Sequence, residues 1–242
     1  MELKILHLVP EMMSLYGEYA NLSVLNRKLT QMGAAVTIVP VSCDETPDFS
    51  DADMIYMGAG TERSQKAALS RLLPHAAALK AAEERGAVIL FTGNAMETLG
   101  KSITDAAGTV CEGLALAEFA TVESEKRDPC DVIAASSLWD APAVGVMNKC
   151  SVTTGVETPL FPSLSLGFGN ETALGAEGYV HGNTFATHIT GPVLVKNPAF
   201  ADLIIARLFA LKNLTLPETL PILPHEREAY AVTLRELQDR VK

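Results

Sequence analysis

The sequence predicts an α/β fold: a mostly parallel, twisted sheet flanked by helices, with a more antiparallel second half. Two observations support this fold class. In the first hundred residues, short apolar segments alternate with helical stretches, and parallel strands need crossovers of that kind. After residue 108 the apolar segments are short, rich in β-formers and separated by turn residues, which is typical of antiparallel pairing.

The first half is expected to hold four strands, at 4–10, 34–41, 53–58 and 87–91. Apolar residues recur at helical spacing between Tyr19 and Gly33, which predicts a helix there. A longer helical stretch runs from Glu62 to Gly86 and should break near Pro74. This order gives the βαβ units of a parallel sheet that is buried on both faces.

The second half is expected to hold strands at 113–123, 131–135, 143–148 and 164–170, and one or two more within 179–189. We expect these strands to continue the first sheet. Asn197 and Pro198 supply an N-cap and a first-turn proline for a following helix. The chain then divides into an α/β domain, residues 1–212, and a proline-rich connector with a C-terminal helix, residues 213–242.

Composition excludes several classes of protein. The 242 residues are 48% hydrophobic and carry a formal net charge of −10, so we expect a globular domain and no nucleic-acid partner, which would need a basic face. The chain has no signal-peptide pattern and no run near the roughly 18 apolar residues of a membrane span. We therefore expect a cytoplasmic protein. Its four cysteines form no CxxC pair, so we expect free thiols and no structural zinc site. We also expect no other metal site and no cofactor.

The ends of the predicted strands are the expected ligand site, because open α/β sheets bind ligands there. The stretch FTGNAMETLG, residues 91–100, reads as a strand, a tight turn and a helix, the geometry in which many α/β enzymes present a nucleophile. Its turn offers Thr92, Gly93 and Asn94, but neither cysteine nor serine. His7 and His188 lie near strand ends, where a general base can sit, although a lone histidine is more often structural. The residues alone give no complete nucleophile–base pair.

Seven stretches taken in order resemble the class I glutamine amidotransferases of the cobyric acid synthase type: HLVPEMMSLYGEYANLSVL, MGAGTERSQ, FTGNAMETLG, a segment ending EKRDPCD, VGVMN, GFGN and THITGPVLVKNP. The resemblance covers most of residues 4–198 and implies a flavodoxin-like fold. Within the family, the sequence most resembles the glutaminase subunit of lipid II isoglutaminyl synthase. That branch works beside a Mur-ligase-like subunit to amidate D-glutamate in peptidoglycan precursors.

The resemblance places the family's reacting groups at two unsuitable residues. The family elbow carries its cysteine in a pattern like CGGYQLLG, and counting back from Leu99 and Gly100 puts that position at Gly93. The general-base histidine lies in a pattern like GTYLHGPLLPKNP and falls at Thr190. The carboxylate that completes a triad falls at Glu18.

The resemblance also assigns residues for ligand binding. Arg127 falls at the arginine that holds the glutamine substrate, and the glycine loop on the oxyanion side corresponds to Gly58, Ala59 and Gly60. We add Asn94, at the elbow, to this ligand-binding set.

Glycine has no atom with which to attack an amide, and threonine does not accept a proton near neutral pH. The leading hypothesis is therefore a non-hydrolysing, amidotransferase-like pseudoenzyme. It would bind glutamine or a related small carboxylate and act beside a Mur-ligase-like synthetase. One alternative is an active amidotransferase of cell-wall or cobalamin (cobyric acid) amidation, with Thr92 and His188 as relocated catalytic groups. Another is a non-catalytic interaction module.

Overall fold

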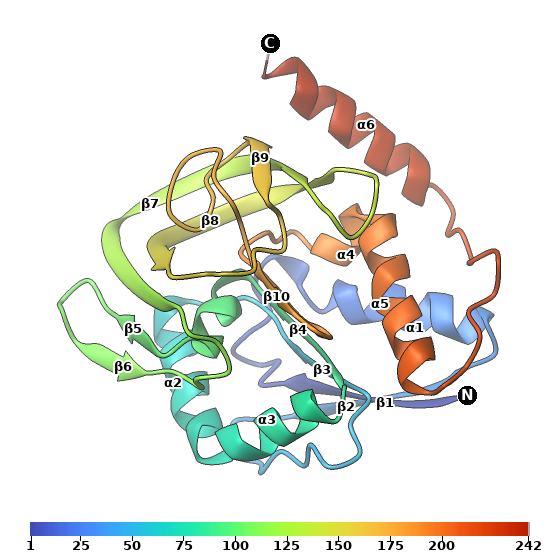
Figure 1. Cartoon of the computed structure of the whole chain (residues 1–242), viewed down its shortest axis with the longest axis horizontal. Coiled ribbons are helices and arrows are strands. Elements are labelled where there is room, and N and C mark those ends of the chain that lie inside the picture. The colour runs from blue at the N-terminus through green and yellow to red at the C-terminus, as the bar shows by residue number, and fades with distance from the viewer. Residues whose placement is uncertain (242) are drawn as a thin grey trace.

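The computed structural model describes residues 1–241 and contains two β-sheets flanked by helices (Figure 1). The first sheet has six strands in the order β10-β11-β4-β3-β1-β2. Their bounds are β1 (Glu2–Leu8), β2 (Ala35–Val41), β3 (Met54–Met57), β4 (Val88–Thr92), β10 (Tyr179–His181) and β11 (Thr184–Thr187). All neighbours pair in parallel except β10 and β11, so the predicted α/β fold is confirmed.

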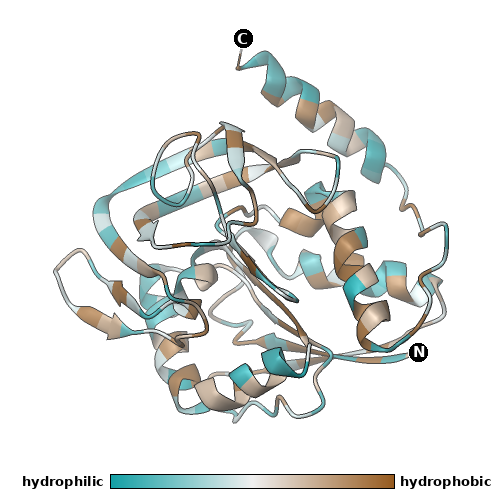
Figure 2. Cartoon of the chain, viewed as in Figure 1, coloured by the Kyte–Doolittle hydropathy of each residue, from teal (hydrophilic) through white to brown (hydrophobic). Residues whose placement is uncertain are grey.

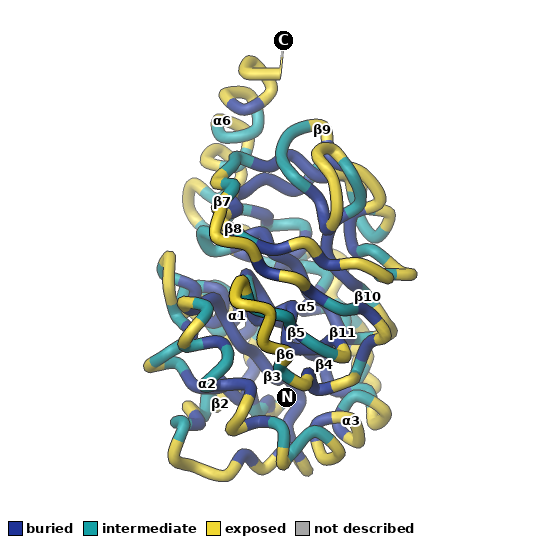
Figure 3. The backbone as a smooth tube through the Cα atoms, turned by 90° about the vertical axis from the view of Figure 1, so that its left-hand side faces the viewer, coloured by how far each residue is buried: buried dark blue, intermediate teal, exposed yellow. Residues whose placement is uncertain are grey.

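Helices cover both faces of the first sheet. Its central strands are dark blue, and thus buried, in Figure 3 and carry many hydrophobic residues in Figure 2. Along β4, Val88 and Leu90 pack into one core with α1 (Ala20–Gln31) and α5 (Pro198–Leu211). The alternate residues Ile89 and Phe91 pack into a second core with α2 (Glu62–Leu72) and α3 (Ala76–Glu84). This alternation follows from the two-residue period of a strand.

The second half forms a sheet of its own, whose strands are β5 (Ser102–Thr104), β6 (Val110–Glu112), β7 (Ala120–Ala135), β8 (Ala143–Thr154) and β9 (Ser163–Leu166). All its pairs are antiparallel except β5 with β7. The expected antiparallel character is confirmed, but the expectation that these strands continue the first sheet is wrong for all except β10 and β11. Strands β7 and β8 pair with each other in a long antiparallel hairpin, which lies across the end of the first sheet (Figure 1).

Strand β7 replaces two predicted strands. The segments 113–123 and 131–135 were expected to be separate, yet Ala120–Ala135 is one strand, and residues 113–119 lie outside it. A shift in the β7–β8 register between Glu123 and Asp128 accommodates the charged run that separates the two apolar segments.

The helical predictions largely agree with the structure. The stretch after Glu62 breaks at η2 (Leu73–His75), as the proline predicts. Helix α5 begins at Pro198, but the side chain of Asn197 does not cap it. Instead, Asn197 binds the backbone N–H and C=O of Val144 at 2.7 and 2.8 Å and so fixes β8 to the short helix α4 (Val193–Lys196).

The C-terminal helix α6 (Glu226–Asp239) lies on the outside of the molecule (Figure 1). Its Leu237, Leu234 and Tyr230 pack against β7 and β8. The helix was predicted to run to the last residue, Lys242, which lies outside the described residues.

None of the helices found between residues 1 and 241 has both the length and the apolar character required to cross a membrane.

Candidate functional site

A cavity of about 190 Å³ lies where the carboxyl ends of β1, β3, β4 and β11 face β7 and β8. Seven of the residues predicted for the site line it: Ala59, Gly60, Gly93, Asn94, Arg127, His188 and Thr190. Three others, Glu18, Gly58 and Thr92, are buried and do not line it.

The predicted turn after β4 presents no side chain at its tip. Strand β4 runs directly into η3 (Gly93–Leu99), which is a 3-10 helix in place of an α-helix. Gly93 has φ of 62°, in the left-handed region that glycine adopts without a steric penalty. The strand–turn–helix geometry is therefore present, and at its tip the buried Gly93 offers only backbone to the cavity.

Thr190 lies beside Gly93 because β11 pairs in parallel with β4, with Thr187 opposite Thr92. A Cβ atom placed on Gly93 would lie 3.1 Å from Thr190 Cγ2. The Thr190 hydroxyl donates to the carbonyl of Val146 at 3.1 Å. The structure thus brings positions 93 and 190 together. The Thr190 hydroxyl is already bonded to the backbone of β8.

Glu18 joins this cluster from the loop after β1. Its Oε1 accepts the backbone N–H of Gly191 at 3.1 Å, and its Oε2 accepts from Asn21, Tyr56 and the Thr92 hydroxyl. Burial raises the pKa of Glu18 to about 7, although these hydrogen bonds act to lower it. The Thr92 hydroxyl is therefore bound inside the protein, next to a carboxyl group that titrates near neutrality.

His188 lies between two buried glutamates that the sequence reasoning missed. Its Nδ1 is 3.1 Å from Glu177 Oε1, and its Nε2 is 3.4 Å from Glu97 Oε1. Burial and Lys149 act to lower the pKa of His188, but the two carboxylates outweigh them and raise it. Burial acts to raise the pKa of Glu97, yet its contact with His188 brings it below the ordinary value. These shifts favour a buried imidazolium. Its network is separate from that of Thr92.

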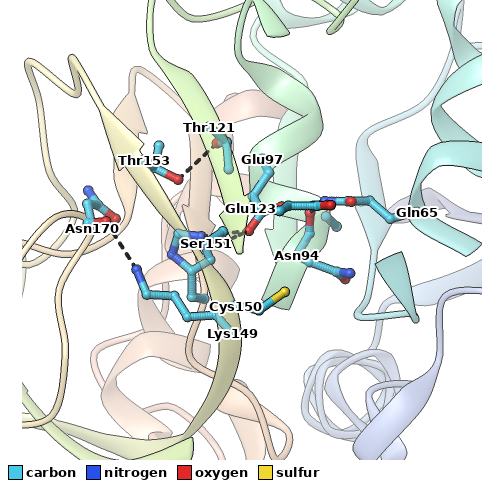
Figure 4. Close-up of polar contacts among 12 residues, drawn as sticks. Gln65, Asn94, Glu97, Thr121, Glu123, Lys149, Cys150, Ser151, Thr153 and Asn170 are labelled. Atoms are coloured by element: carbon cyan, nitrogen blue, oxygen red, sulfur yellow. Dashed lines mark hydrogen bonds and ion pairs between the residues drawn. The ribbon is translucent and has the colours of Figure 1, made fainter. Parts of the chain in front are cut away.

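Glu97 is the centre of the polar floor of the cavity (Figure 4). It accepts hydrogen bonds from Gln65 Nε2 at 2.6 Å and from Ser151 Oγ at 2.5 Å. A signal for this residue was present in the sequence, because Glu97 follows Gly93 by about one helical turn in the segment after the buried strand β4. Glu177 gave no comparable signal, since it lies in an irregular loop far along the chain.

Lys149 and Cys150 reach the cavity from β8 (Figure 4). Lys149 Nζ turns to the carbonyls of Gly169 and Asn170, at 2.5 and 3.1 Å. Cys150 Sγ donates to Glu62 Oε1 at 3.5 Å. Burial, aided by the charge of Glu62, raises the pKa of Cys150 to about 11. The cysteine in the cavity is therefore a protonated thiol and a weak nucleophile.

Arg127 lies in the irregular stretch of β7, where the shifted register directs it to the mouth of the cavity. Its guanidinium forms an ion pair with Glu62 and donates Nη1–H to the Asn148 carbonyl at 3.0 Å. The predicted ligand-binding arginine thus already holds a carboxylate of the protein.

The loop of Gly58, Ala59 and Gly60 is fixed on both sides. The Asn94 side chain accepts the Gly60 N–H and donates to the Gly60 carbonyl, both at 3.0 Å. On the other side, Leu15 N–H donates to the Ala59 carbonyl at 2.9 Å. Asn94 therefore binds the loop itself, and the Gly60 N–H is already bonded.

The four cysteines are half-buried free thiols. Within residues 1–241, no group of three or more His, Cys, Asp and Glu side chains is arranged to hold a metal ion.

Comparison with known proteins agrees with this architecture. Residues 4–198 match the CobB/CobQ-like glutamine amidotransferase domain. The chain is 26% identical over 213 residues to the lipid II isoglutaminyl synthase (glutamine-hydrolyzing) subunit GatD of Staphylococcus aureus, covering 88% of this chain and 87% of that protein. It is 25% identical over 231 residues to the subunit of the same name from Streptococcus pneumoniae, covering 93% and 88%.

Two solved glutamine amidotransferases share the fold. One superposes with a TM-score of 0.55 at 11% identity, covering 84% of this chain and 98% of its own. The other, from Thermotoga maritima, has a TM-score of 0.50 at 9% identity and covers 99% and 97%. Because the family match spans most of the sequence, this chain belongs to the CobB/CobQ-like glutamine amidotransferase family.

Proposed function

We propose that this chain is a non-hydrolysing, glutamine amidotransferase-like subunit that acts beside a Mur-ligase-like synthetase in the amidation of peptidoglycan precursors. It keeps the pocket at the strand ends and binds glutamine or a related small carboxylate there. It does not release ammonia from its ligand.

The observation that carries this proposal is that the nucleophile position, Gly93, and its two nearby candidate replacements, Thr92 and Cys150, supply no activated nucleophile to the cavity. Gly93 presents only backbone at the turn, and the Thr92 hydroxyl is buried outside the cavity, where it donates to Glu18 and does not reach a ligand. The raised pKa of Cys150 keeps its thiol protonated. Amide hydrolysis through a covalent intermediate needs an anionic or base-activated attacking atom, and none of these three residues supplies one.

The same geometry gives little support to relocated catalysis through Thr92 and His188. Thr92 hydrogen-bonds to Glu18 and Tyr56, whereas His188 hydrogen-bonds to Glu177 and pairs by charge with Glu97. A nucleophile and its base need to be within hydrogen-bond reach of each other, and these two residues belong to different networks.

Support for a partner comes from the relatives, both of which are named as subunits of a synthase. A subunit without a reaction of its own acts through the protein that it binds. In its family's context, that partner is an enzyme that transfers nitrogen to a carboxylate.

A glutaminase assay tests the proposal directly. The purified chain, alone and with a co-expressed Mur-ligase-like synthetase, should release no glutamate from glutamine above the buffer background. A turnover on the order of 1 s⁻¹, ordinary for enzymes, would overturn it. An ammonium salt, supplied in place of glutamine, controls for a synthetase that is itself inactive.

Calorimetry separates this proposal from a pure interaction module. The proposal expects glutamine, or glutamate as the related carboxylate, to bind the chain with measurable heat. If neither ligand binds but the synthetase does, the pocket has no role and the interaction module is the better description.

A further inference from the structure

The space in front of the elbow tip is filled by the methyl group of Ala59. A Cβ atom placed on Gly93 would lie 2.5 Å from Ala59 Cβ and 3.2 Å from Ala59 Cα. Non-bonded carbon atoms pack at about 3.5–4.0 Å, so no side chain at position 93 fits without displacing Ala59. The second neighbour, Thr190 Cγ2, lies farther away, at 3.1 Å.

The backbone at Ala59 cannot shift away from Gly93, because both neighbouring glycines pack directly against the loop of residues 12–18. A Cβ on Gly58 would lie 2.7 Å from the Met13 carbonyl oxygen, and one on Gly60 would lie 2.8 Å from that of Met12. Hydrogen bonds from Leu15 and to Asn94 hold the loop in this place. A close-packed interior of this kind resists an added methyl group.

We propose that Ala59 is the residue that excludes every side chain from the elbow tip, and that it does so by contact with position 93. This inference rests on the proposed non-hydrolysing function and deepens it. Replacement of Gly93 alone by a nucleophile is blocked by Ala59, so two residues in contact, Gly93 and Ala59, keep the elbow tip free of a side chain.

A stability cycle tests the contact without any measurement of activity. Gly93→Ala adds a methyl group at the tip and should lower Tm by about 10 °C, through overpacking and through the left-handed backbone. Ala59→Gly alone should lower Tm by about 3 °C. The double variant Ala59→Gly/Gly93→Ala should be more stable than Gly93→Ala, with a Tm about 5 °C higher.

Gly182→Ala is the matched control for the backbone term. Gly182 has φ of 55°, close to that of Gly93, and nothing lies within 4 Å of a Cβ placed on it. Gly182→Ala should therefore lower Tm by only about 3 °C, and Ala59→Gly should not rescue it. Thr190→Ser removes the other nearby methyl group and should rescue Gly93→Ala less than Ala59→Gly does.

Additive losses in the double variant, or a better rescue by Thr190→Ser, would overturn the inference. If Gly93→Ala does not fold, recovery of folded protein by Ala59→Gly is the expected result, and its failure overturns the inference equally. The wild-type glutaminase assay tests the proposed function separately. Hydrolysis by the wild type would contradict that function and leave the measured contact between positions 59 and 93 unchanged.

Discussion

Glu18 Oε1 accepts the backbone N–H of Gly191 at 3.1 Å, which joins two residues that are 173 positions apart in the chain. The bond links the loop after β1 to the segment after β11, directly beside Thr190. It places a fully buried carboxyl group behind the two positions where the resemblance expects a nucleophile and a base. The protein keeps this carboxyl although no histidine lies at position 190.

The Glu18 carboxyl should make the free energy of unfolding depend on pH. Its pKa is about 7 in the folded protein and lower in the unfolded chain. The native state thus binds more protons in that range, and stability is lost as pH rises from about 4.5 to 7. The loss should reach about 3 kcal/mol, at 1.36 kcal/mol for each tenfold change in proton affinity.

Urea denaturation at pH 5, 6, 7 and 8 measures this slope. Glu18→Gln should be less stable at pH 5, because the NH₂ group of glutamine faces hydrogen-bond donors where an oxygen of Glu18 accepts. The variant should lose much less stability than the wild type between pH 5 and 8. Glu171→Gln, at an exposed site, should retain the wild-type slope. An equal slope in Glu18→Gln and wild type would show that Glu18 does not titrate in this range.

His188→Ala should destabilise the protein by about 3–5 kcal/mol, because it leaves Glu177 and Glu97 as buried carboxylates without their shared cation. Chemical denaturation measures the loss at pH 6. His225→Ala, whose side chain is 84% exposed, should change stability by less than about 0.5 kcal/mol. A loss for His188→Ala no larger than that of the control would contradict the buried ion triad.

Arg127→Ala should weaken glutamine binding by at least about tenfold if Arg127 holds the ligand carboxylate, since a charge-assisted hydrogen bond contributes about 1.5–3 kcal/mol. Glu62→Gln should instead strengthen binding, because it releases Arg127 from its ion pair. Titration calorimetry gives both constants.

The neighbouring residue provides the control for these two variants. Lys126 is 81% exposed and pairs with Asp128 outside the cavity, so Lys126→Ala should bind glutamine as the wild type does. If Glu62→Gln and Arg127→Ala weaken binding equally, the ion pair itself shapes the pocket and Arg127 is not the carboxylate ligand.

Cys150 should react slowly with iodoacetamide at pH 8, although it lines the cavity. A pKa of about 11 leaves at least about a hundredfold less thiolate than an ordinary cysteine with a pKa near 8.5. Mass spectrometry of timed alkylation, with glutathione as the reference thiol, measures the rate. Glu62→Gln removes a nearby negative charge and should therefore speed the reaction. Fast alkylation of the wild type would contradict the raised pKa and make Cys150 a candidate nucleophile.

The first sheet could be predicted well from the sequence because its signal is local. The apolar segments around β1, β3 and β4 and the helices between them differ in period, so each element was located within a few residues. The second sheet was harder to predict. The charged run before Asp128 interrupts the apolar alternation of β7, and only pairing with β8 shows that the strand continues across it.

The sequence by itself determined the fold class, the turn that carries Gly93 and, through motif order, the family resemblance. These features depend on residue types at fixed spacing along the chain. Only the tertiary structure decided what surrounds the turn. It set Ala59 against Gly93, buried Glu18 behind Thr190 and held His188 between Glu97 and Glu177. Each of these relationships joins residues from separate elements. They depend on steric exclusion and burial in the folded protein, which the spacing of residues along the sequence does not reveal.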